Sequence, residues 1–309
     1  MGNKKKVAVV LSTYNPNPIF LEEQIMSLIN QTYPVDIYIR DDGSKRKESL
    51  LYLKEIGQKF NRVKIEFSFN KGVFDSFFDL LNDVYNLGYY DYISLADQDD
   101  IATENKISIA VSNLNDWDYI PCLFFSRMTY VNNHLTPLGL SLINPNVLGF
   151  RNAIVESSIN GNLMVLNKKA LELVVRKKPE NFYMHDWWIY MCVSAFGKIL
   201  YSPESTLLYR QHELNVIGAD ESFFSIMKTR IKRFSRFSEK TYPIITQATE
   251  FLSIFKSELT EENRNLLCSL IKSKMSLKNR VMYSIRGDVV RMKKIDNLLL
   301  RALFICNKY

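Results

Sequence analysis

Over its first 100 residues the chain alternates short apolar runs with stretches of helical periodicity, and this alternation limits the fold more than any other feature of the sequence. The apolar runs are Val7–Leu11, Val35–Ile39, Val63–Phe67 and Tyr92–Leu95. The helical stretches between them are Phe20–Asn30, Lys47–Phe60 and Phe74–Leu87. A β-α-β-α-β-α-β order predicts an α/β fold in which helices cover both faces of a mostly parallel sheet.

Polar residues follow each of the four predicted strands. These segments are Ser12–Asn15, Asp41–Ser44, Asn70–Gly72 and Asp97–Asp100. Polar loops also turn a chain and cap the next helix, which would explain any one of the four. Because ligands of such sheets bind beyond the carboxyl ends of the strands, four polar loops at the same edge favour a binding site there.

The pattern changes twice after residue 100. Short strands are predicted at Leu123–Phe125, Ile159–Leu166 and Leu207–Tyr209, with helices near Lys168–Val175 and Asp186–Ser194. Beyond Asp220 the pattern is helical and strongly basic. We therefore expect a domain over residues 1–220, divided into halves at residue 100, and a basic helical region over residues 221–309.

Three carboxylates lie in the four residues Asp97, Gln98, Asp99 and Asp100, directly after a predicted buried strand. Carboxylates this close repel one another and raise each other's pKa unless a cation neutralises them. Mg²⁺ and Mn²⁺ prefer oxygen ligands, and Mg²⁺ is typically held by one or two protein carboxylates plus substrate phosphates. An Asp-x-Asp triplet recurs by chance, but its place at the edge of the sheet indicates a metal–diphosphate site.

A second acidic segment, Asp41-Asp42-Gly43-Ser44, is predicted on the same edge. A carboxylate at a strand end can accept hydrogen bonds from a ribose hydroxyl or a base N–H. Gly43 allows the backbone to turn sharply or to approach a ligand closely. An Asx-turn that leads into the helix at Lys47 would explain the same residues, and both interpretations stay open from this segment alone.

Taken in order, these segments resemble family-2 glycosyltransferases of the GT-A fold. Three later segments resemble the bacterial polysaccharide rhamnosyltransferases of that family: Gly161-Asn162-x-x-x-x-Asn167, His185-Asp186-Trp187-Trp188 and Tyr209-Arg210-Gln211-His212-x-x-Asn215-x-x-Gly218. The resemblance covers roughly residues 5–220. It implies a Rossmann-like sheet with flanking helices, in which residues 1–100 bind a nucleotide sugar and residues 101–220 bind the acceptor.

The resemblance also implies a role for individual residues. Those that contact the nucleotide-sugar donor would be Thr13, Tyr14, Asn15, Asp41, Asp42, Gly43, Asp97, Gln98, Arg210 and Gln211. Asp99 and His212 would bind the Mn²⁺ or Mg²⁺ ion that bridges the donor diphosphate. The acceptor would contact Gly161, Asn162, His185, Trp187 and Trp188.

Asp186 is implied as the catalytic base, and the chemistry supports this role. Inverting glycosyl transfer needs a carboxylate that takes the proton of the acceptor hydroxyl as its oxygen attacks the anomeric carbon. Trp187 and Trp188 beside it would offer aromatic faces to a sugar ring. The plain alternative is a core helix over Trp187–Phe196 with Asp186 as its N-cap, and the two roles are compatible.

The expected function is inverting, metal-dependent transfer of L-rhamnose from dTDP-L-rhamnose to a growing cell-surface polysaccharide on a lipid carrier. A UDP-hexose donor is the nearest alternative. A sugar-phosphate nucleotidyltransferase would carry a Gly-rich basic phosphate loop near the N-terminus, and Ser12–Pro18 is not one. An inactive carbohydrate-binding protein is a third alternative, disfavoured because Asp99, Asp186 and His212 are present.

The net charge of +7 is distributed unevenly. Residues 228–309 hold 18 Lys and Arg against 7 Asp and Glu, so the rest of the chain is mildly acidic. One face of a helix in this region would carry Phe223, Phe224, Met227, Ile231 and Phe234, opposite Lys228, Lys232, Arg233 and Arg236. A basic amphipathic helix favours an anionic membrane surface, although a helix docked on the catalytic domain would show the same pattern. A nucleic-acid partner is disfavoured because no binding motif is present.

The four cysteines lie far apart in the sequence, which fits a reduced cytosolic chain and argues against a zinc knuckle and a disulfide scaffold. The five-residue apolar run after Lys4–Lys6 is too short for a signal peptide. No window of the sequence approaches the roughly 20 apolar residues of a membrane span. We therefore expect a cytoplasmic protein, peripheral on the inner face of the membrane and possibly a homo-oligomer.

Overall fold

The computed structural model describes residues 4–211 and 243–309. The alternation predicted for the first 100 residues is confirmed. The elements of this part are β1 (Val7–Thr13), α1 (Pro18–Ile29), β2 (Val35–Asp42), α2 (Lys47–Lys59), β3 (Val63–Ser68), α3 (Val73–Leu87) and β4 (Tyr92–Ala96). Local signals set their limits: Asn17 caps α1 by accepting from the Ile19 amide at 3.0 Å, and α3 ends at Gly88 in the left-handed region.

The second half adds shorter elements. They are β5 (Ile101–Ala102), α4 (Lys106–Leu114), η1 (Asn115–Trp117), β6 (Cys122–Val131), β7 (Pro137–Leu140), η2 (Pro145–Val147), α5 (Phe150–Ala153), η3 (Gly161–Leu163), β8 (Val165–Asn167), α6 (Lys168–Val175), α7 (His185–Phe196) and β9 (Lys198–Arg210). Residues 243–309 form four helices: α9 (Pro243–Phe255), α10 (Glu261–Ser273), α11 (Leu277–Arg286) and α12 (Lys294–Ile305).

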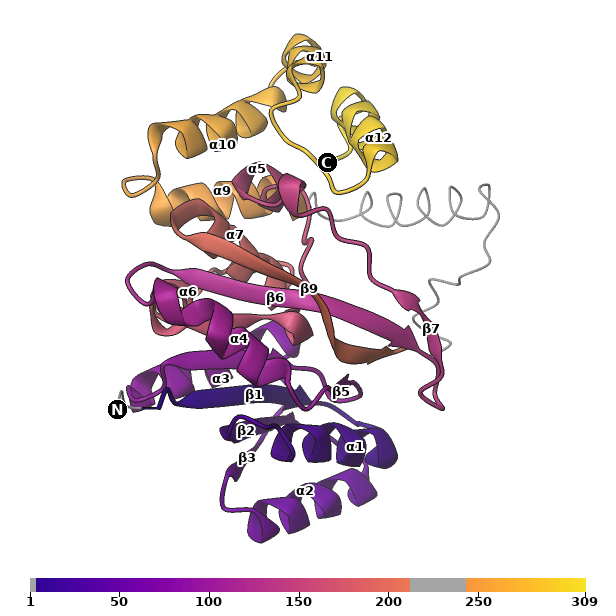
Figure 1. The fold of residues 1–309 in the computed structure, drawn as a ribbon. Coiled ribbons are helices and arrows are strands. Elements are labelled where there is room, and N and C mark those ends of the chain that lie inside the picture. The colour runs from indigo at the N-terminus through magenta and orange to yellow at the C-terminus, as the bar shows by residue number, and fades with distance from the viewer. Residues whose placement is uncertain (1–3, 212–242) are drawn as a thin grey trace.

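Within the described residues the strands form one mixed sheet in the order β3-β2-β1-β4-β8-β6-β9-β5, with β7 paired to β6. Strands β3, β2, β1 and β4 are parallel neighbours, so their carboxyl ends meet at one edge. The strand β8 runs antiparallel between β4 and β6, and β6 and β9 form a second long parallel pair. The chain therefore joins a Rossmann-like half to a second half on the same sheet (Figure 1).

Each face of the sheet has its own apolar core. Helices α1, α2 and α4 bury Leu21, Leu53 and Ile107 against one face. Helices α3, α6 and α7 cover the other face, where Phe77 and Trp188 belong to a larger cluster. Coverage on both faces explains why the central strands are nearly continuous apolar runs.

Two expectations for the second half were wrong in detail. Ile159–Leu166 is not one strand, because a 3-10 turn at Gly161–Leu163 precedes the short strand β8. The predicted strand Leu207–Tyr209 is the end of β9, a strand of 13 residues. Its Ser202-Pro203-Glu204 segment interrupts the apolar alternation, and its register against β6 shifts beyond Phe125.

The C-terminal helices share the larger core with the sheet. Trp188 of α7 packs against Phe251 and Phe255 of α9 at ring-centroid distances of 5.6 and 5.8 Å. Figure 1 shows α10, α11 and α12 beyond α9, at the end of the molecule away from α2. None of the helices in residues 4–211 and 243–309 is long and apolar enough to cross a membrane. The amphipathic helix predicted around Phe223–Phe234 lies outside the described residues.

Candidate active site

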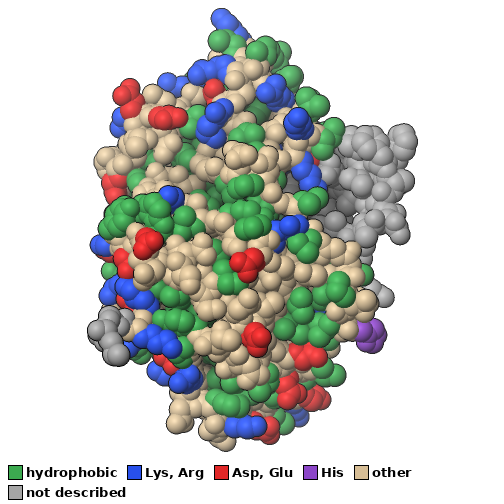
Figure 2. Space-filling model, viewed as in Figure 1, with side chains coloured by type: hydrophobic (Ala, Val, Ile, Leu, Met, Phe, Trp, Pro, Cys, Tyr) green, Lys and Arg blue, Asp and Glu red, His purple; other side chains and the backbone are tan. Residues whose placement is uncertain are grey.

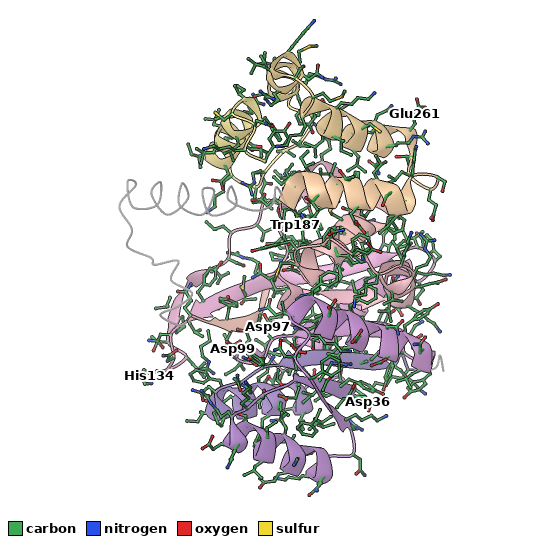
Figure 3. All side chains as sticks on the ribbon, turned by 180° about the vertical axis from the view of Figure 1, so that it is seen from behind. Asp36, Asp97, Asp99, His134, Trp187 and Glu261 are labelled. Carbon is green, nitrogen blue, oxygen red and sulfur yellow. The ribbon has the colours of Figure 1, made fainter. Side chains whose placement is uncertain are left out.

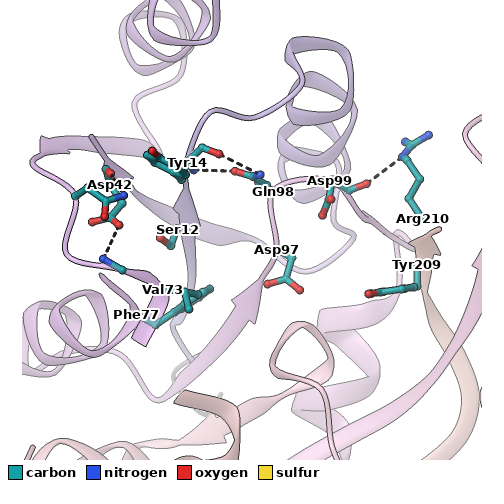
Figure 4. A pocket seen from close by; sticks show the side chains of 12 residues that line it. Ser12, Tyr14, Asp42, Val73, Phe77, Asp97, Gln98, Asp99, Tyr209 and Arg210 are labelled. Atoms are coloured by element: carbon teal, nitrogen blue, oxygen red, sulfur yellow. Dashed lines mark hydrogen bonds between the residues drawn. The ribbon is translucent and has the colours of Figure 1, made fainter. Parts of the chain in front are cut away.

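A pocket of about 370 Å³ opens at the carboxyl ends of β1, β2 and β4. Its walls come from both halves of the sheet and from the first turns of α3 (Figure 4). The lining residues are Ser12, Tyr14, Asp42, Asn70, Gly72, Val73, Phe77, Asp97, Gln98, Asp99, Tyr209 and Arg210. The predicted edge site therefore exists as a cavity, and five of the ten predicted donor contacts line it: Tyr14, Asp42, Asp97, Gln98 and Arg210.

The two aspartates at the end of β2 differ in their surroundings. Asp41 is 1% exposed and accepts from the Thr13 hydroxyl at 3.0 Å and from the Ser44 amide at 2.9 Å. Asp42 accepts from the amides of Lys71 and Gly72 at 2.8 and 2.9 Å and lines the pocket. Asp41 and Thr13 thus brace the loop. Asp42 is 2% exposed and holds the Lys71–Gly72 turn through both of its oxygens, at the wall of the pocket.

Gly43 allows two loops to touch. Its φ is +79°, and a Cβ built on it would lie 2.7 Å from the backbone nitrogen of Asn70. Asn70 in turn donates from its side chain to the Asp42 carbonyl at 3.0 Å. Glycine is required here by conformation and by space together, so Gly43 acts through the shape of the pocket wall.

We expect Gly43→Ala to lower the free energy of unfolding by about 1–3 kcal/mol, because the new methyl group adds a backbone clash to left-handed strain. The measurement is urea unfolding followed by circular dichroism. Gly88→Ala is the matched control, since Gly88 has φ +76° and open space around the position. Equal losses in the two variants would show that the approach of Asn70 is unimportant.

Gln98 and Asn15 connect the loops around the pocket mouth. The Gln98 side chain accepts from the Tyr14 amide at 2.8 Å, and the Tyr14 ring is 47% exposed. Asn15 has φ +45° and accepts from the Lys45 amide at 2.7 Å. Gln98 and Asn15 therefore position the loop, while the open ring of Tyr14 is available for a flat ligand such as a nucleotide base.

The three carboxylates after β4 have separate environments. Asp97 and Asp99 line the pocket (Figure 4). Asp100 is 1% exposed and accepts from the Asn162 side chain at 2.6 Å and from the Arg210 amide at 3.2 Å. Asp100 is therefore a structural carboxylate. Its hydrogen bonds connect residues 97–100, which we call the acidic loop, to η3 and β9.

A buried cation offsets this negative charge. Lys106, 1% exposed, donates to the Asn162 carbonyl at 2.5 Å, and burial lowers its pKa to about 8 against the opposing attraction of Asp100 and Asp97. The pKa of Asp97 is nevertheless raised, by burial first and then by the charges of Asp99 and Asp186. The single positive charge of Lys106 therefore does not neutralise the carboxylates of the acidic loop.

The acidic loop fits a divalent cation. Its donors are carboxylate oxygens, the kind that Mg²⁺ and Mn²⁺ prefer, and their mutual repulsion would be relieved by such an ion. Over residues 4–211 and 243–309, no group of three or more His, Cys, Asp or Glu side chains could hold a metal. That finding is compatible with a site in which the protein gives one or two ligands and a diphosphate gives the others. His212, the second predicted ligand, lies outside the described residues.

Arg210 lines the pocket, and its guanidinium is engaged with protein atoms, while its expected donor contact stays a prediction. It is 2% exposed and donates to the Asp99 carbonyl at 3.0 Å, to the Asn133 carbonyl at 2.9 Å and to Glu23 at 2.5 Å. Its guanidinium also lies 4.1 Å from the ring centroid of Phe20. Arg210 therefore clamps the acidic loop. Gln211 follows it and donates its amide to the Val131 carbonyl at 2.8 Å.

Asp186 is the second residue of α7, and its charge reaches Asp97. The N-cap of this helix is Met184, so the N-cap role considered for Asp186 is wrong. The Asp186 carboxylate accepts from the Trp187 amide at 2.7 Å and is also stabilised by the Gly161 amide. Burial outweighs these hydrogen bonds and raises its pKa to about 6, and its charge acts on Asp97. A carboxylate with this pKa is mostly ionised at neutral pH and can still accept a proton, as a general base must.

The expected acceptor contacts are mostly buried, which corrects that part of the prediction. Trp187 and Trp188 are 8% and 1% exposed, and their indole nitrogens donate to the carbonyls of Ala153 and Val174. Asn162 is 1% exposed and holds Asp100. These side chains pack beneath the site, and Figure 3 shows Trp187 next to α9, on the α9 side of Asp97.

His185 and Gly161 form a contact of their own. The His185 ring stacks on Phe77 at 4.0 Å, and neither of its nitrogens has a hydrogen-bond partner. Burial lowers its pKa to about 3, so the ring is neutral. A Cβ on Gly161 would lie 2.8 Å from its Nε2, so glycine leaves the room that the ring occupies. His134, another of the three histidines of the sequence, lies in an exposed turn away from His185 (Figure 3).

Sequence patterns did not single out Tyr209, Val73 or Phe77, all of which line the pocket. Tyr209 stood beside Arg210 in a recognised segment, but its role depends on the path of β9. Its pKa is raised to about 12 by burial and by the nearby aspartates, so its hydroxyl keeps its proton. Val73 and Phe77 belong to an ordinary helical stripe, which gives no sign that its first turn reaches a cavity.

A second pocket of about 300 Å³ shares Gly72 and Val73 with the first. Phe74 and Phe182 contribute aromatic rings to it, and Lys71, Asp75 and Glu180 contribute charged groups. The two pockets are therefore neighbours across the start of α3.

Comparison with known proteins agrees with this geometry. Residues 8–172 match the family model Glycosyl transferase family 2. The chain is 29% identical over 255 residues to the dTDP-rhamnosyl transferase RfbG of Shigella flexneri, which covers 75% of this chain and 80% of RfbG.

Solved structures show the same fold. The S. aureus TarS 1-349 structure in complex with UDP-GlcNAc superposes with a TM-score of 0.60 at 15% identity, over 97% of this chain and 81% of that one. The mannosyltransferase PcManGT from Pyrobaculum calidifontis, in complex with GDP-Man and Mn2+, gives a TM-score of 0.52 at 12% identity, over 99% and 81%. These structures are GT-A glycosyltransferases, as the mixed sheet suggests. The chain therefore belongs to glycosyl transferase family 2 and is a glycosyltransferase.

Proposed function

We propose that this glycosyltransferase transfers L-rhamnose from dTDP-L-rhamnose, with inversion and with a divalent metal ion, to a growing polysaccharide on a lipid carrier. The observation that carries the proposal is the pocket at the carboxyl ends of the strands, lined by Asp97 and Asp99, with the carboxylate of Asp186 near enough for its charge to act on Asp97. The similarity to RfbG supports the choice of donor. The lipid-carried acceptor places the protein at the inner face of the membrane.

Four residues that line the pocket would take part in this reaction, together with Asp186 and His212. Tyr14 and Asp42 would hold the nucleoside, and Asp97 would contact the ribose or the sugar. Asp99, with His212, would hold Mn²⁺ or Mg²⁺, which supplies positive charge to the leaving diphosphate. Asp186 would accept the proton of the acceptor hydroxyl as that oxygen bonds to the anomeric carbon and the bond to the diphosphate breaks.

A panel of nucleotide sugars tests the proposal. We expect release of dTDP from dTDP-L-rhamnose in the presence of Mn²⁺ or Mg²⁺, and little release after the metal is removed with EDTA. UDP-glucose, UDP-GlcNAc and GDP-mannose should be hydrolysed more slowly. Faster turnover of a UDP-hexose would select the alternative donor, and release of pyrophosphate would indicate a nucleotidyltransferase.

Asp99→Asn is the matched variant for the metal, because the amide keeps the size of the side chain and removes its charge. Its residual activity should no longer rise on addition of Mn²⁺. Metal-independent turnover by the unchanged protein, or no turnover with any donor, would contradict the proposal.

A further inference from the structure

Helices α11 and α12 each present an outward row of mixed apolar and basic side chains. On α11 the row is Lys278, Met282, Ile285 and Arg286, and on α12 it is Lys294, Leu298, Arg301 and Ile305. The members of each row are three or four residues apart, which places them on one face of the helix, and Arg286 lies at the edge of the α11 row beside Ile285. All eight side chains are exposed.

The opposite faces of the two helices account for their packing. Tyr283 of α11 meets Phe304 of α12 edge-to-face at 5.0 Å, and Phe304 meets Tyr309 at 4.6 Å. The Ser284 hydroxyl donates to the Arg301 carbonyl at 3.2 Å. The inner contacts therefore hold the helix pair together, and the outward rows are not needed for that purpose.

The outward apolar side chains are unusually open to solvent. Ile285 is 73% exposed, Leu298 62% and Met282 52%, and Met275 in the turn before α11 is 78% exposed. Single exposed apolar residues are common, but a group of this size on one small unit marks an interaction surface. Figure 2 shows apolar and basic side chains together over the end of the molecule where Figure 1 places α11.

Charge decides what this surface can bind. Residues 272–309 contain ten Lys and Arg and two Asp. One of the two, Asp288, pairs with Arg286 at 3.3 Å, so a large positive excess remains. A second copy of the same surface would bring the same charge and be repelled. A nucleic acid would leave the apolar groups without a partner. An anionic lipid bilayer provides a partner for the basic and for the apolar side chains, because its negatively charged headgroups cover an apolar interior.

We propose that the outward rows of α11 and α12 form a docking face for anionic phospholipid, with Met282, Ile285 and Leu298 entering the headgroup region and the basic side chains contacting lipid phosphates. This inference rests on the proposed function, because the reason for membrane docking is that a lipid-carried acceptor would reach the protein at that surface. It assigns the contact to described helices, independently of residues 212–242.

Vesicle sedimentation of the full-length protein tests the docking face. We expect binding to vesicles of phosphatidylglycerol and phosphatidylethanolamine, and little binding to phosphatidylcholine vesicles. The charge variant Lys278→Gln/Lys294→Gln/Arg301→Gln should bind anionic vesicles about a hundredfold more weakly, at roughly 1 kcal/mol for each basic residue. The apolar variant Met282→Ser/Ile285→Ser/Leu298→Ser should lose at least about tenfold, because its inserted groups are shortened and made polar.

Matched controls carry the same changes elsewhere on the surface. Leu51→Ser/Leu142→Ser removes apolar side chains that are 59% and 80% exposed, and Lys169→Gln removes an exposed lysine; both should bind as the unchanged protein does. Wild-type binding by the charge and apolar variants, or equal binding to phosphatidylcholine, would overturn the docking face. Dimer loss in these variants would instead assign the face to a second copy. Hydrolysis of soluble donor should be unchanged in all variants, so failure of the docking face is distinguishable from failure of the proposed function.

Discussion

Replacing Asp186 with Asn is expected to lower the rate of sugar transfer by about 10²–10⁴-fold, the usual contribution of a positioned general base. Donor binding should change little, because Asp42, Tyr14 and the acidic loop are untouched. Asn keeps an oxygen that can accept from the amides of Gly161 and Trp187, so α7 should begin as before. The measurements are kcat with a saccharide acceptor and the donor Kd by calorimetry.

Asp116→Asn is the control for this substitution, since Asp116 is an exposed residue of η1 away from the pocket. In the unchanged protein, kcat/KM should fall about tenfold per pH unit below pH 6, where the Asp186 carboxylate takes up a proton. His185 stays neutral through this range, and Asp97, whose pKa is raised to about 7, takes up its proton at a higher pH than Asp186 does. Loss of donor binding in Asp186→Asn would assign Asp186 to the nucleotide site instead.

Replacing Lys106 with Met is expected to lower the free energy of unfolding by about 3–5 kcal/mol, the usual cost of removing one partner from a buried charged group. Met fills much of the volume of the lysine stem, so the effect reports the lost cation together with its hydrogen bonds to the carbonyls of Leu95 and Asn162. Asp100 and Asp97 would keep their burial and lose the positive charge that attracts them. Urea unfolding at pH 7, where a lysine with a pKa of about 8 is mostly protonated, measures the change by tryptophan fluorescence.

Lys169→Met is the matched control, because Lys169 has the same side chain, 53% exposed, and should cost less than about 1 kcal/mol. A loss in Lys106→Met no larger than in this control would show that the buried carboxylates do not depend on the lysine. The variant Asn162→Asp is a second test of how the buried charges around Asp100 affect stability. It adds negative charge beside Asp100 and should destabilise the protein too.

The fold was predictable where structure follows from neighbouring residues. Strands of the first half are continuous apolar runs, and the polar segments after β1, β2 and β4 come together because parallel strands bring their ends to one edge. The strand β9 was harder, because Pro203 and Glu204 break the alternation that identifies a strand. Its ladder with β6 depends on a register shift that no local pattern encodes.

Within the site, the types of residue were easier to predict than the directions in which their side chains point. Asp97, Asp99 and Asp100 are alike in sequence, but only Asp97 and Asp99 line the pocket, while Asp100 points to Asn162. The two tryptophans of α7 illustrate the same limit. Because α7 is buried nearly all round, it has no polar face from which the direction of its side chains could be inferred. The role of Arg210 as a clamp depends on Glu23, 187 positions away in the sequence.

The contacts of Asp100 have a consequence for the design of hybrid enzymes. Through Asn162, Arg210 and the neighbouring Lys106, this carboxylate joins pieces of three segments that are distant in the chain. A hybrid that combined the first half of this protein with the second half of a relative would cut through that junction. The four residues would have to be transplanted as a set, since any mismatch leaves a buried charge without its counterpart. Exchange of acceptor specificity between such proteins should therefore succeed more often through surface loops than through whole halves.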